Sequence, residues 1–237
     1  AFPELIGLTS PAWAGGSRRF LFSGHSRDGF SDLYLFDREE RRLWRLTRDR
    51  YRDADPAWCG WENSVVWSSD RGPGGDRGAR NLFLLSLETG EIRFLTRGSW
   101  RDLSPVCDSL RRRILCVSDR DGFFDVYGID PEGRGSRLTR SLDAILDPRP
   151  LPDGRGFLAT VYRAGRFEIR RFPLPEAPGD TLALAAADTT RPWDWRVMAS
   201  PVPSRAARYR TRFSLDVAQG GVLLDPGVRT GEGFTAA

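Results

Sequence analysis

Lysine is absent from this sequence of 237 residues, and all 36 basic residues are arginine. So uniform a use of arginine is more typical of a GC-rich genome than of a binding site. The arginines are spread along the chain among 32 acidic residues, without a basic stripe or a recognised nucleic-acid-binding motif. We therefore expect no nucleic-acid partner.

Histidine occurs once, and the common catalytic and cofactor motifs do not occur. Hydrolysis by a Ser–His–Asp triad needs a base beside the nucleophile, but His25 lies in the segment GHSRDG, which we interpret as an exposed turn. There is no GxSxG, no HExxH, no P-loop and no GxGxxG before a helix. We expect neither catalytic residues nor a cofactor in this chain.

Cysteine occurs three times, at positions 59, 107 and 116, and never as a CxxC pair. An odd number with this spacing argues against a disulfide framework and against a structural zinc site. Cys107 and Cys116 could face each other across a hairpin, but the spacing alone does not establish a bond.

Long apolar runs and a leader segment are also missing. No stretch of 18 apolar residues occurs, so we expect no transmembrane helix. The opening residues AFPELIGLTS contain no initiator methionine and neither the basic region nor the apolar core of a signal peptide. We expect the chain to be a piece of a longer protein.

The sequence does contain an internal repeat. Ser-Pro or Asp-Pro begins at positions 10, 55, 104 and 147, and Leu-Thr-Arg begins at 46, 95 and 138. Between these markers lie an apolar run and then an alternating run, such as RRILCVS followed by FDVYGID. Each unit reads as four short strands, and no amphipathic helix is expected before residue 175. Such repeats predict an all-β fold, a β-propeller with four-stranded blades.

The third unit, with SDRDGFFDVYGID, resembles the WD40-like repeat of TolB, and so does the first, with GHSRDGFSDLYLFD. Similar blades occur in the propellers of S9-type and tricorn-type serine peptidases. The second unit departs from the pattern by an insertion, and the fourth has lost both DRDG and Leu-Thr. The resemblance covers about residues 1–175, and it implies about four blades of a truncated larger propeller.

These markers give the expected division of the chain. We expect the end of a preceding blade at 1–9, blades at 10–54, 55–103 and 104–146, a degenerate blade at 147–175, a Pro- and Ala-rich linker at 176–208, and the start of a separate β domain at 209–237. Within the linker, 182–187 could form one helical turn. We expect the Ser or Asp before each proline, and the Thr of Leu-Thr, to hydrogen-bond to the nearby backbone.

The segment YRTRFSLDVA at 209–218 alternates between an apolar and a polar face. It is either an ordinary half-buried strand or the first strand of an outer-membrane barrel, which is built from alternating strands of about this length. A propeller, a Pro-rich linker and such a strand together resemble bacterial proteins that join TolB-like repeats to a surface-antigen barrel of the BamA type.

By the TolB resemblance, we expect a non-catalytic scaffold of the bacterial envelope, in the periplasm or at the outer membrane, that binds a protein or peptide partner. Asp55, Ser104 and Asp147, in the connections between blades, would then line one mouth of the propeller channel. The alternative is a substrate-gating propeller of a serine peptidase whose catalytic domain lies outside this chain.

Asp119, Asp121 and Asp125 form a second candidate site, because three carboxylates around Gly122 could hold a cation. An EF-hand loop, however, needs a Glu six residues after its glycine, where this chain has Gly128. Related Asp-Gly or Arg-Gly segments stand at the same place in the first and second units. We therefore expect a turn between two strands of a blade, with the metal site as the alternative.

Overall fold

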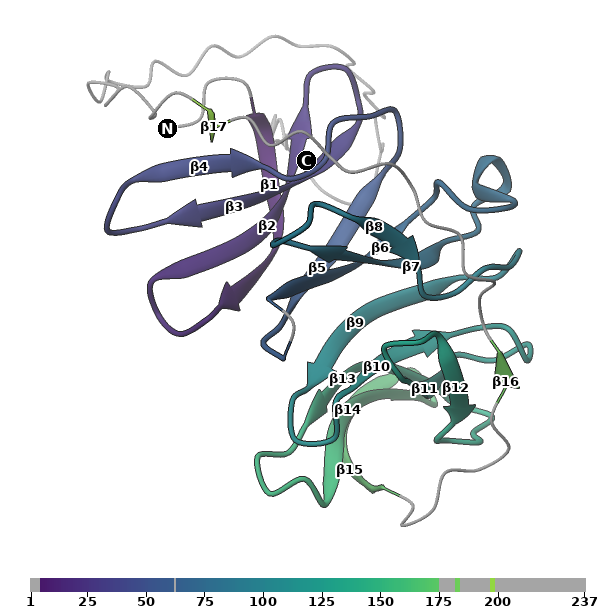
Figure 1. The fold of residues 1–237 in the computed structure, drawn as a ribbon. Helices are drawn as coiled ribbons and strands as arrows, with labels where there is room; N and C mark the ends of the chain where they lie inside the picture. Colours follow the sequence, from purple (N-terminus) through teal and green to yellow (C-terminus); the bar gives the residue numbers. More distant parts are fainter. Residues whose placement is uncertain (1–4, 62, 175–181, 184–196, 199–237) are drawn as a thin grey trace, which may run out of the picture. The chain divides into compact units, whose positions relative to one another are not determined.

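The chain folds into four small antiparallel sheets, each formed by consecutive strands, in the computed structural model (Figure 1). The structure describes residues 5–61, 63–174, 182–183 and 197–198. The first sheet comprises β1 (Leu5–Ala14), β2 (Arg19–Ser26), β3 (Ser31–Asp37) and β4 (Arg42–Arg45). The second comprises β5 (Asp53–Cys59), β6 (Ser64–Ser69), β7 (Asn81–Ser86) and β8 (Ile92–Phe94), with the short 3-10 helix η1 (Gly75–Arg77) before β7.

The third sheet comprises β9 (Asp102–Asp108), β10 (Arg113–Ser118), β11 (Asp125–Ile129) and β12 (Arg134–Arg137). The fourth has three strands, β13 (Ala144–Pro150), β14 (Gly156–Arg163) and β15 (Arg166–Pro173). Two short strands from the tail, β16 (Leu182–Ala183) and β17 (Val197–Met198), pair with β12 and β4. The sequence predicted one helical turn at 182–187. The first two of these residues form β16 instead, so the prediction is wrong there.

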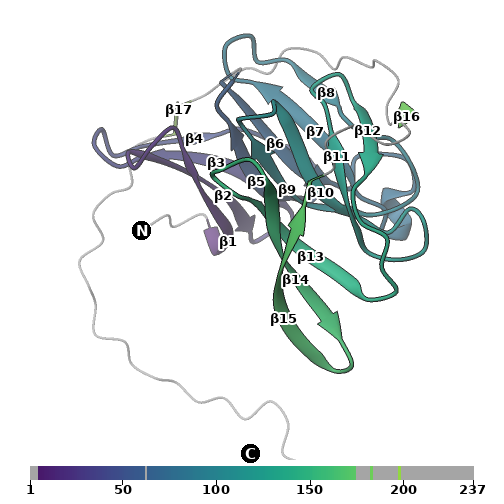
Figure 2. The same ribbon diagram turned by 90° about the horizontal axis from the view of Figure 1, so that it is seen from below.

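Successive sheets contact each other through their first strands. β1 contacts β5, β5 contacts β9, and β9 contacts β13, so these four strands form the inner row of a β-propeller (Figures 1 and 2). The predicted all-β propeller fold is thereby confirmed. β1 begins at Leu5, so residues 5–9 belong to the first blade, where we had expected the end of a preceding one.

The middle strands of the second and third blades are apolar on both faces, because each of these two blades packs between two others. In β6, Val65 and Trp67 pack toward the first blade, whereas Val66 packs toward the third. In the third blade, Ile114 and Cys116 belong to the core shared with the second blade. This double burial explains why these strands read as continuous apolar runs rather than as alternating ones.

The fourth blade is packed on one face only. Its Phe157, Ala159 and Val161 pack against the third blade. Its other face carries Tyr162, Phe167 and Ile169, which are 44%, 68% and 78% exposed. Among the described residues, no hydrophobic cluster joins the fourth blade to the first, as in a truncated propeller.

The Leu-Thr marker fixes the outermost strand to the rest of its blade. The hydroxyl oxygens of Thr47, Thr96 and Thr139 accept the backbone N–H of Leu33, Leu82 and Val126 at 2.8–2.9 Å. The expectation of a bond to nearby backbone is corrected here, since each bond reaches the neighbouring strand, 13 or 14 residues earlier. The repeat of Leu-Thr thus reflects a repeated cross-strand bond.

Replacing Thr96 with valine is expected to lower the free energy of unfolding by about 1–3 kcal/mol, because the buried Leu82 N–H then has no acceptor. Urea unfolding followed by circular dichroism measures this change. Thr160→Val is the matched control, since we find no hydrogen bond of the Thr160 hydroxyl within the described residues. Equal stability of the two variants would contradict this role of Thr96.

A disulfide joins Cys59 at the end of β5 to Cys107 in β9, with 5.3 Å between their Cα atoms. Cys116 is free and buried, and it pairs across the ladder with Tyr127 rather than with Cys107. The sequence argued against a disulfide framework and left only a Cys107–Cys116 bond open, whereas the bond that forms is Cys59–Cys107. The physical reason is that Cys59 and Cys107 follow the Asp-Pro and Ser-Pro of successive repeats, which places them on adjacent inner strands.

Candidate functional site

Each inner strand is interrupted at its Ser-Pro or Asp-Pro pair. The ladder with the second strand skips two residues there, for example between Ala54 and Ala57 in β5. The residue before the proline has a left-handed backbone, with φ of 51°, 52°, 48° and 49° at Ser10, Asp55, Ser104 and Asp147. Proline lacks an N–H, so it fits only where the ladder is broken. A left-handed conformation is uncommon outside glycine, and Asp tolerates it better than most residues.

These four bulges line a cavity of about 370 Å³, which we call the inner-strand cavity. Ser10 donates its hydroxyl to Asp55 Oδ1 at 2.7 Å, and Ser104 donates its hydroxyl to Asp147 Oδ1 at 3.1 Å. The Ser104 N–H lies 3.4 Å from Asp55 Oδ2. One row of hydrogen bonds therefore joins all four blades along the cavity.

The cavity combines carboxylates with apolar walls. Trp13, Ala12 and Val106 line it together with the prolines of the first three blades, and Arg149 adds one basic side chain. Asp147 and Arg149 are exposed, and the other polar residues of the row are half-buried. Two carboxylates beside an apolar wall can accept hydrogen bonds from N–H groups of a bound chain while its apolar side chains contact the wall.

Asp55, Ser104 and Asp147, the three binding residues expected from the sequence, all belong to this cavity. They lie inside strands β5, β9 and β13, however, and not in the connections between blades. Their side chains bond between blades rather than to nearby backbone. The sequence reasoning missed Ser10, although its Ser-Pro is the first copy of the same marker.

Asp119, Asp121 and Asp125, the metal candidate, are each held by basic or hydroxyl groups. Asp119 accepts the backbone N–H and the Nε–H of Arg101, both at 2.7 Å. Asp121 accepts from Tyr127 and Arg137, and Asp125 accepts from Arg137 and Thr139. They are not among the acidic groups that converge in the described part of the chain. The structure thus gives these carboxylates the role of fixing the turn and the outer strand.

One acidic cluster did not stand out in the sequence. Carboxylate oxygens of Asp32, Asp49 and Asp53 lie within 4.8 Å of one another. Burial raises the pKa of Asp32 and of Asp49, while Arg45 and Arg71 oppose the shift as their ion-pair partners. Asp53 also pairs with Arg71. Two guanidinium groups therefore supply the positive charge in this cluster.

His25 lies near the end of β2 and is half-buried, so its assignment to an exposed turn is wrong. Its Nε2 is 3.1 Å from the Thr9 hydroxyl, on the neighbouring strand. Within the described residues, no hydrogen bond or ion pair joins His25 to a carboxylate.

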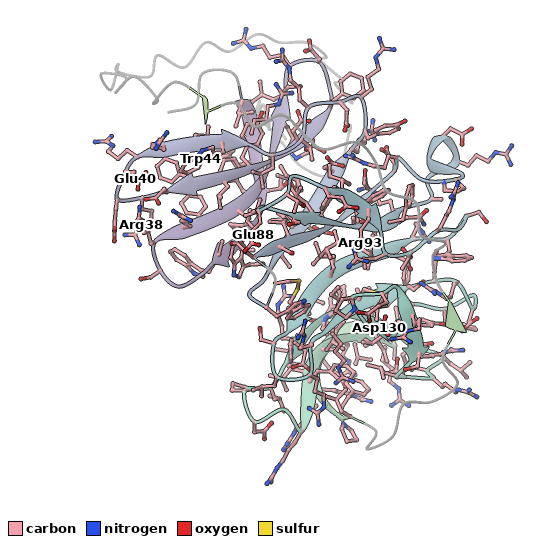
Figure 3. All side chains as sticks on the ribbon, in the orientation of Figure 1. Arg38, Glu40, Trp44, Glu88, Arg93 and Asp130 are labelled. Carbon is pink, nitrogen blue, oxygen red and sulfur yellow. A yellow bond between two sulfur atoms is a disulfide. The ribbon has the colours of Figure 1, made fainter. Side chains whose placement is uncertain are left out.

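The hairpins between the third and fourth strands carry charged side chains away from the inner row. Figure 3 shows Arg38 and Glu40 on the β3–β4 hairpin, Glu88 and Arg93 around the β7–β8 hairpin, and Asp130 before β12. A cavity of about 420 Å³ adjoins Glu88 and Arg93. It lies within a single blade, in contrast to the inner-strand cavity, to which all four blades contribute.

Four packed blades with contacting inner strands, each strand interrupted by a Ser/Asp-Pro bulge, define a β-propeller. No protein-family model and no curated protein sequence matches the chain. Among solved structures, a putative TolB from Agrobacterium tumefaciens is 18% identical, with a TM-score of 0.62 over 76% of this chain and 66% of that one. TolB from Acinetobacter baumannii is 22% identical, with a TM-score of 0.50 over 75% and 45%.

A puromycin-hydrolyzing peptidase from Mycobacterium tuberculosis is also similar, at 16% identity and a TM-score of 0.56 over 78% of this chain and 31% of that one. The chain thus spans less than two thirds of each of these proteins. At such identities the similarity shows the fold, which is that of a TolB-like propeller.

The remaining expectations concern segments that the structure does not describe. The linker at 176–208, apart from β16 and β17, and the alternating strand at 209–218 lie outside the described residues. Within the described part, no helix has both the length and the apolar character that membrane crossing requires.

Proposed function

We propose that this chain is a non-catalytic interaction scaffold of the bacterial envelope, which binds a peptide segment of a partner protein in the inner-strand cavity. The observation that carries the proposal is the convergence of four strained bulges on one cavity. Left-handed backbone at a non-glycine residue costs free energy, and such residues cluster where a site is held in a fixed geometry. Here all four repeats keep that geometry and direct carboxylates and hydroxyls into the same place.

The chemistry of the cavity suggests the kind of segment. Asp55 and Asp147 favour a segment that presents N–H donors or a basic side chain, and the wall of Trp13 and prolines favours small apolar residues. The disulfide supports an extracytoplasmic location, since disulfides persist in the periplasm and are rare in the cytosol. The two TolB neighbours support the same compartment.

The test places a photo-crosslinking amino acid at Arg149, an exposed residue of the cavity, in the protein expressed in bacteria. We expect an adduct with an envelope protein from this position. The same amino acid at Glu88 or Asp130, on the outer hairpins, should give none (Figure 3). Adducts that form at the hairpins and not at Arg149 would contradict the proposal.

A substrate-gating propeller of a serine peptidase is the alternative, favoured by the peptidase among the structural neighbours. The two functions differ in what adjoins the propeller. A GxSxG motif followed by Asp and His in the flanking reading frame would establish the peptidase, and its absence there would leave the scaffold.

A further inference from the structure

The fourth blade ends in an open strand edge, which we call the β15 edge (Figure 2). Within the described residues β15 pairs with β14 alone, whereas the third strand of every other blade pairs with a fourth strand, β4, β8 or β12. Residues 166–169 and 171 of β15 are exposed, and they lie on both faces of the strand. An edge strand presents unpaired backbone N–H and C=O groups, which can pair with another chain.

Other blade edges of this chain already accept an added strand. The short strands β16 and β17 pair antiparallel with β12 and β4, which are the fourth strands of the third and first blades. β15 has eight residues, whereas β4, β8 and β12 have four, three and four. The β15 edge is therefore the longest outer edge among the described blades, and it belongs to the blade that lacks a fourth strand.

Ile169 of β15 is equivalent to the residue that holds the fourth strand in the other blades. The equivalent residues are Leu33, Leu82 and Val126, because each pairs with the second-strand residue opposite the one that precedes the Ser/Asp-Pro bulge. Those three side chains are fully buried, whereas Ile169 is exposed. The fourth blade therefore has the position for a fourth strand, but the described chain does not cover it.

In the first three blades, the Leu-Thr pair binds both backbone groups of this residue. The Thr hydroxyl accepts its N–H at 2.8–2.9 Å, and the Leu N–H donates to its C=O at 2.7–2.8 Å. The sequence contains no Leu-Thr pair after residue 139. Residues 140–237 thus do not carry the marker that would bind Ile169 in the same way.

The backbone groups of Ile169 point toward the open side of β15. The Leu174 N–H donates to the Arg155 carbonyl across the β14–β15 pair at 3.2 Å, and the two directions alternate along an antiparallel strand. Even-numbered residues of β15 therefore bond toward β14, and Phe167, Ile169 and Arg171 direct their N–H and C=O groups outward. The β15 edge thus presents the same backbone groups that Leu-Thr binds elsewhere.

The side chains of β15 indicate the charge of a fitting segment. In the register of β4 on β3, the residue before Leu lies opposite Arg170, and the residue before that one lies opposite Arg171. Arg170 is paired with Glu168 at 2.6 Å, but the nearest carboxylate recorded for Arg171 is that of the exposed Asp153, at 3.7 Å. Since β15 contains three arginines and one glutamate, acidic residues at these two positions form favourable cross-strand pairs.

We propose that the β15 edge binds an extended segment of a partner protein, in which two acidic residues precede Leu-Thr, as the fourth strand of the fourth blade. The Leu N–H of the segment donates to the Ile169 C=O, and its Thr hydroxyl accepts the Ile169 N–H. In such strand addition, main-chain hydrogen bonds give affinity and alternate side chains give specificity. The β15 edge is separate from the inner-strand cavity and does not depend on the function proposed for that cavity.

Fluorescence anisotropy of the full chain tests the proposal with the peptide Gly-Ile-Glu-Glu-Leu-Thr-Gly-amide, labelled with fluorescein at its N-terminus. The control peptide has N-methylleucine in place of leucine, which removes the N–H that pairs with the Ile169 carbonyl. We expect saturable binding of the first peptide. Binding of the control should be at least about tenfold weaker, because the lost hydrogen bond leaves a strand carbonyl without its donor and the methyl group obstructs the pairing.

Two variants place the binding on β15. Ile169→Pro removes the outward N–H and leaves the ladder with β14 intact, since proline is tolerated where the N–H of an edge strand faces solvent. Binding should be lost while the urea midpoint is kept. Arg171→Glu should weaken binding of the acidic peptide about fivefold, or about 1 kcal/mol, because an opposite-charge pair becomes a like-charge pair.

The matched control is Arg27→Glu, at an exposed arginine in the β2–β3 turn of the first blade, which should leave binding unchanged. A peptide with Lys in place of both Glu should bind Arg171→Glu more tightly than the unaltered chain. The proposal is overturned if the acidic peptide does not bind, if the N-methylleucine peptide binds equally well, or if Arg171→Glu and Arg27→Glu have the same effect.

Discussion

Replacing Trp67 with alanine is expected to lower the free energy of unfolding by about 3–5 kcal/mol, the range for removal of a buried aromatic side chain. Trp67 is fully buried in the core between the first and second blades. Its ring stacks on Phe83, with 5.7 Å between ring centroids, and its indole N–H donates to Asp53 Oδ1 at 3.0 Å. The Arg71 guanidinium carbon lies 5.5 Å from the ring centroid.

Alanine at position 67 removes all three contacts and leaves a cavity at the blade interface. Urea unfolding followed by circular dichroism gives the free energy, and an unchanged m-value would show that the denatured state is unaltered. Trp67→Phe separates the contributions: it keeps a ring against Phe83 and should cost about 1–2 kcal/mol for the lost hydrogen bond.

Trp13→Ala is the second control, since Trp13 is 59% exposed and its truncation should cost much less. A similar loss of stability from Trp13→Ala and from Trp67→Ala would contradict the assignment of the larger loss to burial of Trp67 between the first and second blades.

Removing the disulfide is expected to cost about 4 kcal/mol, the chain-entropy value for a closed loop of about 50 residues. Cys59 and Cys107 are 48 residues apart in sequence, and their bond joins the inner strands of the second and third blades. In a propeller that is not closed by contact between its described end blades, such a bond limits the separation of two neighbouring blades.

The measurement is the urea midpoint of the oxidised chain, of the chain in dithiothreitol, and of the Cys59→Ser/Cys107→Ser variant. The urea midpoints of the reduced chain and of the double-serine variant should agree, and both should lie below the midpoint of the oxidised chain. Cys116→Ala is the matched control for loss of a buried sulfur. Burial raises the pKa of the Cys116 thiol, and Asp102 adds to the shift, so this thiol stays protonated and does not exchange with the disulfide at neutral pH. An oxidised chain that is no more stable than the reduced one would contradict the prediction.

The fold was predictable because the repeat is written in residue types with a fixed physical role. Thr96 accepts a backbone N–H of the adjacent strand, and the proline of each Ser/Asp-Pro pair requires a break in the ladder. A hydroxyl acceptor for that N–H and a proline at the break in the ladder are required once in each blade that carries the marker. Thr and Pro therefore recur with the period of the blade. In the fourth unit, where Leu-Thr is lost, the described sheet has no fourth strand.

Interactions between blades were not predictable, because they depend on which strands become neighbours. Cys59 and Cys107 each follow a Ser/Asp-Pro pair, but only the packing of β5 beside β9 brings them within bonding distance. Similarly, Asp55 was expected to bond to local backbone, and it accepts a hydrogen bond from Ser10 on another blade. Comparison of equivalent positions in successive repeats could have identified Ser10 and Asp55, which both precede a marker proline, but not the two cysteines, whose distances from that proline differ by one residue.

The central claim is that Asp55 and Asp147 bind a partner segment in the inner-strand cavity. Its most direct test is the yield of the Arg149 photo-adduct after Asp55→Asn and Asp147→Asn. Asparagine tolerates the left-handed backbone at these bulges and keeps an acceptor oxygen, so the substitutions remove the charge and preserve the fold. We predict at least a tenfold lower yield with an unchanged urea midpoint, and an undiminished yield would contradict the claim.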